Sequence, residues 1–217
     1  MRRNIDLIKL LQKIDHISCP KFTNFHTHTT CSDGSLSPSD LIKQANSYRI
    51  DHISITDHHS VQAYHHLNKY RGGIPGNPNY HTTLWTGIEI SCLLKNCLVH
   101  VIGLDFELNS KSLTPYINGE ATTGDKLQAV SVVNAIHQAG GLAILAHPAR
   151  YRLGFTTLIK EAHYLGFDGG EAWYDYSMND IWSPSKLICN DIHKQLSNLG
   201  MLSTCGTDTH GTNLLGR

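Results

Sequence analysis

Seven strand-like segments alternate with helix-like segments along this chain, and this alternation limits the folds that it can adopt. The strand-like segments are short and mostly apolar, and they lie at 24–28, 52–57, 83–91, 98–105, 142–146, 170–174 and 203–207. Most are followed by a helix-like stretch. The first of these opens with Ser37-Pro38, where serine can cap a helix and proline suits its first turn. Strands separated by helices form parallel sheets, so the pattern predicts an α/β protein.

One connection departs from this pattern. Only Cys92–Cys97 separates the third and fourth segments, which is too short for a crossover helix, so we expect an antiparallel hairpin there. No linker or shift in composition divides the remaining segments, which predicts a single domain at 23–217. The simplest closed architecture is a βα barrel, and a doubly wound sheet is the structural alternative. Residues 1–22 are expected to form an amphipathic helix that packs on this domain.

Charge and cysteine usage exclude several classes of protein. Lys plus Arg and Asp plus Glu balance at 18 each in 217 residues, so we expect no stable binding of duplex nucleic acid and no membrane association. The N-terminal stretch lacks the apolar centre of a signal peptide, and no run approaches the ~18 apolar residues of a membrane span. The six cysteines form no C-x-x-C pair, which favours reduced thiols and a cytoplasmic protein. The composition predicts nothing about the oligomeric state.

Histidine is the unusual residue, with 15 copies. His26 and His28 would point to the same side of one strand, where two imidazoles can bind one metal ion. An isolated H-x-H pair is weak evidence, but nearly every later segment also ends in a metal-ligand residue type. With Asp33 in the turn after the first segment, the candidate ligands are His26, His28, Asp33, His58, Glu89, His100, His147, Asp208 and His210.

These candidates should converge, because a βα barrel gathers the carboxyl ends of its strands at one face. They are too many for one ion, so we expect two or three divalent ions that share a bridging carboxylate. A set of imidazoles and carboxylates without thiolates suits Zn, Mn or Fe and argues against a structural zinc finger.

In order along the chain, the motifs HTHTTCSDGS, ITDHH, GIEIS, HVIGLD, LAHPARY and GTDTHG resemble those of the polymerase and histidinol phosphatase (PHP) family of phosphoesterases. The resemblance runs from about Asn24 to the C-terminus. HPARY with GIEIS and HVIGL is most similar to the branch of nucleoside 3′,5′-bisphosphate phosphatases and 5′-3′ exoribonucleases. The family fold is a distorted (β/α)7 barrel.

The resemblance implies a trinuclear metal site. Its first ion would be bound by His26, His28, Glu89 and Asp208; its second by Asp33 and His58 with Glu89 bridging; its third by His100, His147 and His210. Clustered dications lower the pKa of a bridging water, so that hydroxide can attack a phosphomonoester. The expected substrate is a small phosphorylated molecule: a nucleotide, a nucleoside bisphosphate or an oligonucleotide 5′ end.

Catalytic roles are expected for Asp33, His58, Asp208, His210 and Arg150. Arg150 would also bind a phosphate oxygen pair, and His59 and Glu171 are further candidates for substrate contact. Glu171 and Tyr174 lie near the sixth segment. Each could equally support a metal ligand, contact the substrate or simply pack in the core. Asp57 is expected to orient a ligand histidine rather than to bind metal.

Two departures from the family pattern and three alternatives accompany this interpretation. Phe106–Gly141 is shorter than the inserted helical segment usual in that branch, and His59 stands where the branch often has Asp. The alternatives are a histidinol-phosphatase-like enzyme, an amidohydrolase, whose barrels also begin with H-x-H, and a non-catalytic metal-binding accessory module.

Overall fold

The computed structural model describes residues 5–69, 81–179 and 181–216. Its α-helices are α1 (Ile5–Leu11), α2 (Pro38–Ser47), α3 (Gln62–Lys69), α4 (Ala129–Gln138), α5 (Phe155–Tyr164) and α6 (Lys186–Asn198). Its strands are β1 (Thr23–Asn24), β2 (His52–Ser54), β3 (Thr83–Trp85), β4 (Gly87–Leu94), β5 (Cys97–Leu104), β6 (Leu142–Leu145), β7 (Gly169–Trp173) and β8 (Leu202–Cys205). Three 3-10 helices complete the list: η1 (Lys111–Tyr116), η2 (Gly124–Leu127) and η3 (Pro148–Arg150).

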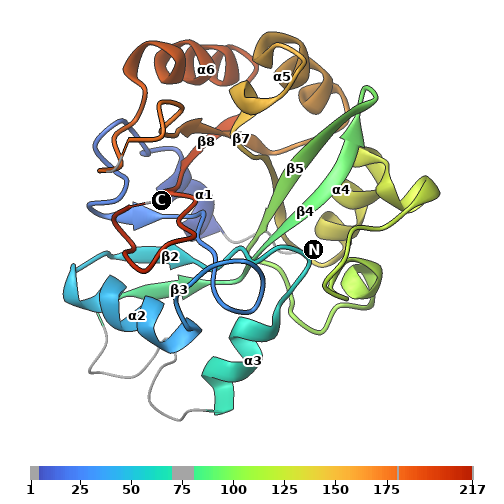
Figure 1. The fold of residues 1–217 in the computed structure, drawn as a ribbon. Coiled ribbons are helices and arrows are strands. Elements are labelled where there is room, and N and C mark those ends of the chain that lie inside the picture. The colour runs from blue at the N-terminus through green and yellow to red at the C-terminus, as the bar shows by residue number, and fades with distance from the viewer. Residues whose placement is uncertain (1–4, 70–80, 180, 217) are drawn as a thin grey trace.

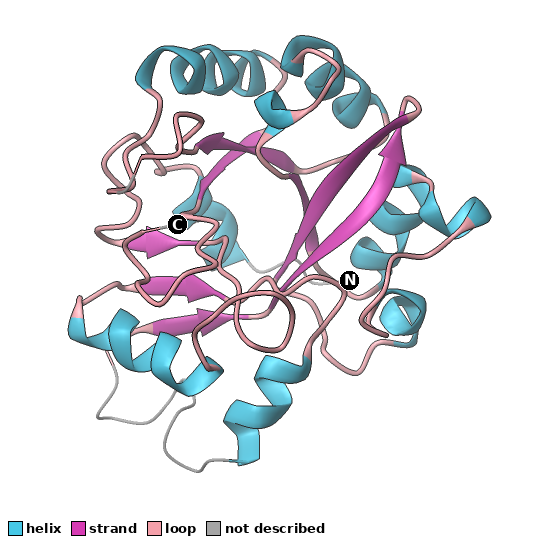
Figure 2. Cartoon of the chain, viewed as in Figure 1, coloured by secondary structure: helices cyan, strands magenta, loops and turns pink. Residues whose placement is uncertain are grey.

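The strands form two sheets that face a common centre, with α2 to α6 outside them (Figures 1 and 2). One sheet is parallel, in the order β1-β2-β3, and the other is mixed, in the order β4-β5-β6-β7-β8. β5 runs antiparallel to both of its neighbours, β4 and β6, whereas β6, β7 and β8 are parallel to one another. The chain is therefore an α/β protein, and the hairpin expected around Cys92–Cys97 is confirmed.

The two sheets correct the expectation of seven strands in one continuous barrel. The segment expected at 83–91 is divided at Thr86, whose hydroxyl hydrogen-bonds both the N–H and the C=O of Phe106 at 2.8 Å. The chain bends there, so β3 pairs with β2 while β4 pairs with β5. Isolated bridges, Thr27 with Thr209 and His58 with Glu89, are what join the two sheets.

Local sequence explains where the helices begin and end. Ser37 caps α2, since its hydroxyl accepts the N–H of Asp40 at 3.1 Å, and Leu41 and Ala45 on its inner face are fully buried. The apolar spacing of 125–139 predicts a helix from Asp125, but α4 starts at Ala129, because the 3-10 helix η2 occupies the preceding turn. α4 ends before Gly140, which has a φ of +86°.

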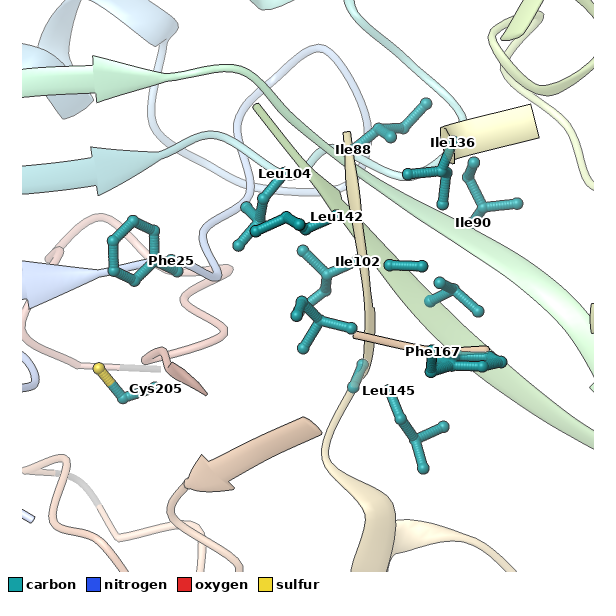
Figure 3. Packing of buried hydrophobic residues seen from close by; sticks show 14 of the residues in the cluster. Phe25, Ile88, Ile90, Ile102, Leu104, Ile136, Leu142, Leu145, Phe167 and Cys205 are labelled. Carbon is teal, nitrogen blue, oxygen red and sulfur yellow. The ribbon is translucent and has the colours of Figure 1, made fainter. Parts of the chain in front are cut away.

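The apolar core lies between the mixed sheet and its helices (Figure 3). Ile88, Ile90, Ile102, Leu104 and Leu145 are at most 1% exposed. All four residues of β6 are buried, as expected for a strand that is covered on both faces.

The N-terminal segment lies against this domain. α1 packs near β8, and its Leu7 and Leu11 are at most 1% exposed. Over the part of the chain that is described, no helix is long and apolar enough to cross a membrane. All six cysteines are free thiols, and five of them are buried.

Some expected boundaries differ. Of the first segment, only Asn24 lies in a paired strand, β1 (Thr23–Asn24), so His26 and His28 follow β1 rather than lie in it. The polar sequence of 109–123 predicts a loop, but this stretch contains η1. The Pro, Gly and Asn content of 74–80 predicts a loop, and Arg71-Gly72-Gly73 predicts a helix end; both lie outside the described residues.

Candidate metal centre

All nine candidate ligands meet at one end of the parallel strands. His26, His28 and Asp33 follow β1, His58 follows β2, His147 follows β6, and Asp208 and His210 follow β8. Glu89 and His100 instead lie inside β4 and β5, and not at the strand ends expected from the sequence. The reason is that the β4–β5 hairpin extends beyond the site, so that the site meets the first half of β4 and the middle of β5.

Glu89 is the central carboxylate. Its Oε2 lies 3.0 Å from Nε2 of His26 and 3.1 Å from Nε2 of His28. Its Oε1 lies 2.9 Å from Nδ1 of His100 and 3.3 Å from Nε2 of His147. Glu89 therefore contacts imidazoles from both sheets through its two oxygens, an arrangement suited to bridging two ions.

Three groups of ligand atoms could each hold a cation, the atoms of each lying within 4.8 Å of one another. They are His26, His28, Glu89 and Asp208; His28, Asp33, His58 and His210; and His58, Glu89 and His100. The first agrees with the set implied by the resemblance. His210 differs from it, because its Nε2 lies 3.4 Å from Oδ2 of Asp33, in the second group rather than beside His100 and His147.

The pKa values of the two most deeply buried histidines in the cluster are raised by the carboxylates around them. Burial alone would lower the pKa of His26, but the carboxylates of Glu89 and Glu171 outweigh it and hold that pKa well above the ordinary value. The pKa of His28 rises to about 9, because the adjacent carboxylates of Asp208 and Glu89 outweigh its burial.

The pKa values of the buried carboxylates shift in the opposite direction, to lower values. Burial would raise the pKa of Glu89, but His26 and the other imidazoles around it hold it well below its usual range, and His26 and His28 do the same for Asp208. Burial instead lowers the pKa of His58 to about 4. Glu89 and Asp208 are 1% and 2% exposed, and two ionised carboxylates buried so deeply require compensating positive charge.

The donor set fits divalent metal ions. Several buried ring nitrogens and a carboxylate oxygen in the cluster have no hydrogen-bond partner among the described residues: Nδ1 and Nε2 of His28, Oε1 of Glu89, Nδ1 of His100 and Nδ1 of His147. Buried polar atoms are normally hydrogen-bonded, and a metal ion would satisfy those of these atoms that face the cluster, such as Nε2 of His28 and Oε1 of Glu89.

Two ligand residues have strained backbones. Asp208 has a φ of 53° and His147 a φ of 25°, in the left-handed region that non-glycine residues seldom adopt. The N–H of Asp208 is held by the carbonyl of His26 at 2.9 Å, and the N–H of His147 by Oε2 of Glu171 at 2.8 Å. Strain of this kind persists where surrounding contacts fix it, and it is common at functional sites.

Residues around the ligands hold them in place. Oε1 of Glu171 lies 3.1 Å from Nδ1 of His26, and Glu171 is fully buried. Glu171 therefore lies behind the ligand cluster, in a position to orient His26 rather than to meet a substrate. Asp57 accepts the N–H and hydroxyl of Thr29, each at 2.6 Å, and so fixes the turn that carries Asp33.

Gly206 allows the closest backbone approach in the site. A Cβ at this position would lie 2.1 Å from Cβ of His26 and 2.9 Å from Oε1 of Glu171. Only glycine can occupy such a position without moving its neighbours.

Arg150 and His59 have different surroundings. Nη1 of Arg150 donates to Oδ2 of Asp208 at 3.1 Å and to the hydroxyl of Tyr174 at 3.0 Å, and the Arg150 side chain is one third exposed. His59 is only 4% exposed, and its Nε2 accepts the N–H of Ser91 at 3.2 Å. Arg150 thus reaches the open side of the cluster, while the His59 ring is engaged with β4.

The fold and the cluster together define an α/β protein whose gathered imidazoles and carboxylates could hold divalent metal ions. The family model of the PHP domain matches residues 24–205, so the chain belongs to the PHP family. A 5′-3′ exoribonuclease of Haemophilus influenzae is 28% identical over 142 residues, and 5′-3′ exoribonuclease Rnm of Escherichia coli is 26% identical over 143 residues. These matches cover 59% of this chain and 49% and 47% of the relatives, so the chain spans about half the length of the curated relatives it matches.

Solved structures show the same fold. An amidohydrolase from Chromobacterium violaceum superposes with a TM-score of 0.70 at 18% identity, over 87% of each chain. A Bifidobacterium adolescentis protein, described as a metal-dependent phosphoesterase, superposes with a TM-score of 0.65 at 16% identity, over 91% of this chain and 93% of that one. At these identities the likeness concerns the fold alone.

Proposed function

We propose that this protein is a metal-dependent phosphoesterase that hydrolyses a phosphomonoester on a nucleotide, a nucleoside bisphosphate or an oligonucleotide 5′ end. The observation that carries the proposal is the convergence of eight imidazole and carboxylate side chains around Glu89, beside an arginine whose side chain is one third exposed. Membership of the PHP family and the similarity to two bacterial 5′-3′ exoribonucleases support it.

The proposed ligands are the three groups given above, two of which include Glu89, together with His147, whose ring lies next to that of His100. When bound, two or three divalent ions of Mn, Zn or Fe would supply a hydroxide nucleophile near neutral pH and would neutralise the phosphate oxygens. Asp33 suits a site that receives substrate, because its side chain is 55% exposed while His28 beside it is fully buried. Asp33, His58, Asp208 and His210 would thus be catalytic as ligands.

Arg150 would bind the phosphate. A guanidinium forms paired hydrogen bonds with phosphate oxygens, and among the described residues its hydrogen bonds run through Nη1 alone, to Tyr174 and Asp208. The other edge of the guanidinium is therefore available to a ligand on the open side. His59 and Glu171 were the other candidates for substrate contact. Because both side chains are buried, their positions favour supporting the ligand residues over touching the substrate.

We also propose that the two sheets act as one distorted (β/α)7-like barrel at 23–217, with residues 1–22 packed on it. The bridges Thr27–Thr209 and His58–Glu89 support this, because they join the sheets at the level of the ligands.

The experiment measures phosphate release before and after metal removal. A chelator should abolish phosphate release from nucleotides, nucleoside bisphosphates or short 5′-phosphorylated oligonucleotides, and Mn or Zn should restore it. If the protein hydrolyses histidinol phosphate alone, the proposed reaction type stands but the proposed substrate class is wrong. Amide hydrolysis without phosphatase activity, or no hydrolysis by fully metal-loaded protein, would refute the proposal.

A further inference from the structure

Tyr174, just beyond the end of β7, is not a ligand, yet its hydroxyl contacts two residues of the site. The hydroxyl donates to Oδ2 of Asp208 at 2.7 Å and accepts from Nη1 of Arg150 at 3.0 Å. Nη1 of Arg150 also donates to the same Oδ2 at 3.1 Å, which closes a triangle of three hydrogen bonds. One phenol thus connects a metal-ligand candidate with the phosphate-binding candidate.

The two oxygens of Asp208 have separate tasks. Oδ1 lies 3.1 Å from Nε2 of His28 and 3.3 Å from Nε2 of His26, inside the first ligand group. Oδ2 points away from these imidazoles to Tyr174 and Arg150. Because a carboxylate is planar, fixing Oδ2 also fixes the direction in which Oδ1 is presented.

The Tyr174 side chain is well placed to act as a rigid support. It is 1% exposed, and its ring packs against His147 with 5.3 Å between ring centres and against Tyr176 with 5.0 Å. Its backbone carbonyl accepts the N–H of Ser185 at the start of α6 at 3.1 Å. Burial and the adjacent Asp208 raise the pKa of the phenol, so the hydroxyl keeps the proton that it donates.

We propose that Tyr174 is a positioning residue for the phosphoesterase reaction. Its hydroxyl holds Asp208 and Arg150 in one arrangement, so that the ligand oxygen of Asp208 and the free edge of the Arg150 guanidinium face the substrate phosphate together. This inference rests on the proposed function. Charged groups that are held in place in this way act without rearrangement during the reaction. Tyr174 would contribute to the reaction without binding a metal ion itself.

The test compares Tyr174→Phe with Tyr176→Phe. Tyr176 is the matched control because it packs beside Tyr174, and its hydroxyl has no hydrogen-bond partner among the described residues. Three quantities are measured on metal-loaded protein: the dissociation constant of inorganic phosphate by calorimetry, the visible absorption spectrum of the Co²⁺-substituted form, and kcat with KM for a phosphomonoester.

For Tyr174→Phe we expect the affinity for inorganic phosphate and kcat each to fall at least about tenfold, with an altered Co²⁺ spectrum. Tyr176→Phe should match the wild type in all three. Loss of the hydroxyl should also matter less in an Arg150→Ala background, because the two residues act as one unit.

The outcomes separate this inference from the proposed function. A Co²⁺ spectrum and phosphate affinity of Tyr174→Phe equal to those of the wild type, or additive effects of the two substitutions, would overturn the positioning role while wild-type phosphatase activity stands. Absence of phosphate release by the wild type would overturn the proposed function. In that case the Co²⁺ spectrum of Tyr174→Phe still decides whether Tyr174 orients Asp208.

Discussion

Two buried regions of this molecule consist of opposite chemistry. Around Ile102, Leu104 and Leu145, the mixed sheet buries apolar side chains that are at most 1% exposed. In the ligand cluster, the inner side chains are at most 3% exposed, although they are imidazoles and carboxylates: His26, His28, Glu89, His147 and Asp208. The apolar region satisfies itself by packing, whereas the polar region leaves ring nitrogens without partners. Folding alone therefore explains the first region, whereas the unsatisfied ligand atoms of the second suit a cation.

The largest effect should come from Glu89→Gln. The substitution keeps the side-chain shape but removes the charge that faces five histidines, so metal binding should be lost and phosphate release should fall on the order of 10³-fold. Elemental analysis and steady-state rates measure it. The unfolding midpoint in the presence of a chelator serves as the control and should not fall. Full metal content in this variant would show that Glu89 does not bridge.

Asp33→Asn tests the exposed side of the cluster. Because the Asp33 side chain is 55% exposed, the fold should be intact, while phosphate release should fall at least ~10²-fold if the second ion positions the nucleophile. The matched control is Asp40→Asn, an equally exposed carboxylate on α2, which should keep the wild-type rate. Near-normal activity of Asp33→Asn would mean that Asp33 does not bind the ion that positions the nucleophile.

Gly206→Ala tests the contact between the backbone and the cluster. The new Cβ would lie 2.1 Å from Cβ of His26, so we expect a loss of about 1–3 kcal/mol in the free energy of unfolding, together with reduced metal content. Gly154→Ala is the control, because a Cβ there would have no atom within 4 Å. Equal stability and metal content in both variants would show that Gly206, after β8, does not pack closely against His26, after β1.

Ile102→Val should have the smallest effect and should affect only the apolar region. The lost methyl group should cost roughly 0.5–1.5 kcal/mol of unfolding free energy, measured by denaturant titration, with metal content and activity unchanged. A loss of metal in this variant would mean that the two regions are not independent.

The sequence predicted those features that depend on local pattern. The α/β alternation, the cap at Ser37 and the hairpin at Cys92–Cys97 follow from spacing and turn chemistry, and they were found. The division of one segment at Thr86 was not predicted, because it depends on a hydrogen bond to Phe106, twenty residues away. The 3-10 helix η1 was missed because Lys111–Tyr116 is largely polar and contains Pro115.

For the candidate site, the ordered motifs singled out residues that lie together in the structure, but they did not predict how these residues are grouped. Each motif places a ligand type near a strand end, and barrel geometry brings such ends together. The grouping of His210 with Asp33 depends on how the turn after Asp33 folds against the segment after β8, where the N–H of Ser35 donates to the carbonyl of His210. Likewise, only the structure distinguishes Glu171, behind His26, from a substrate contact.

Metal content is the most direct test of the difference between the two buried regions. Elemental analysis of the purified protein, paired with thermal unfolding before and after chelation, measures whether the polar region needs cations. We predict two or three divalent ions per chain and a fall in the unfolding midpoint when they are removed. Less than one ion per chain, with undiminished stability after chelation, would contradict the account.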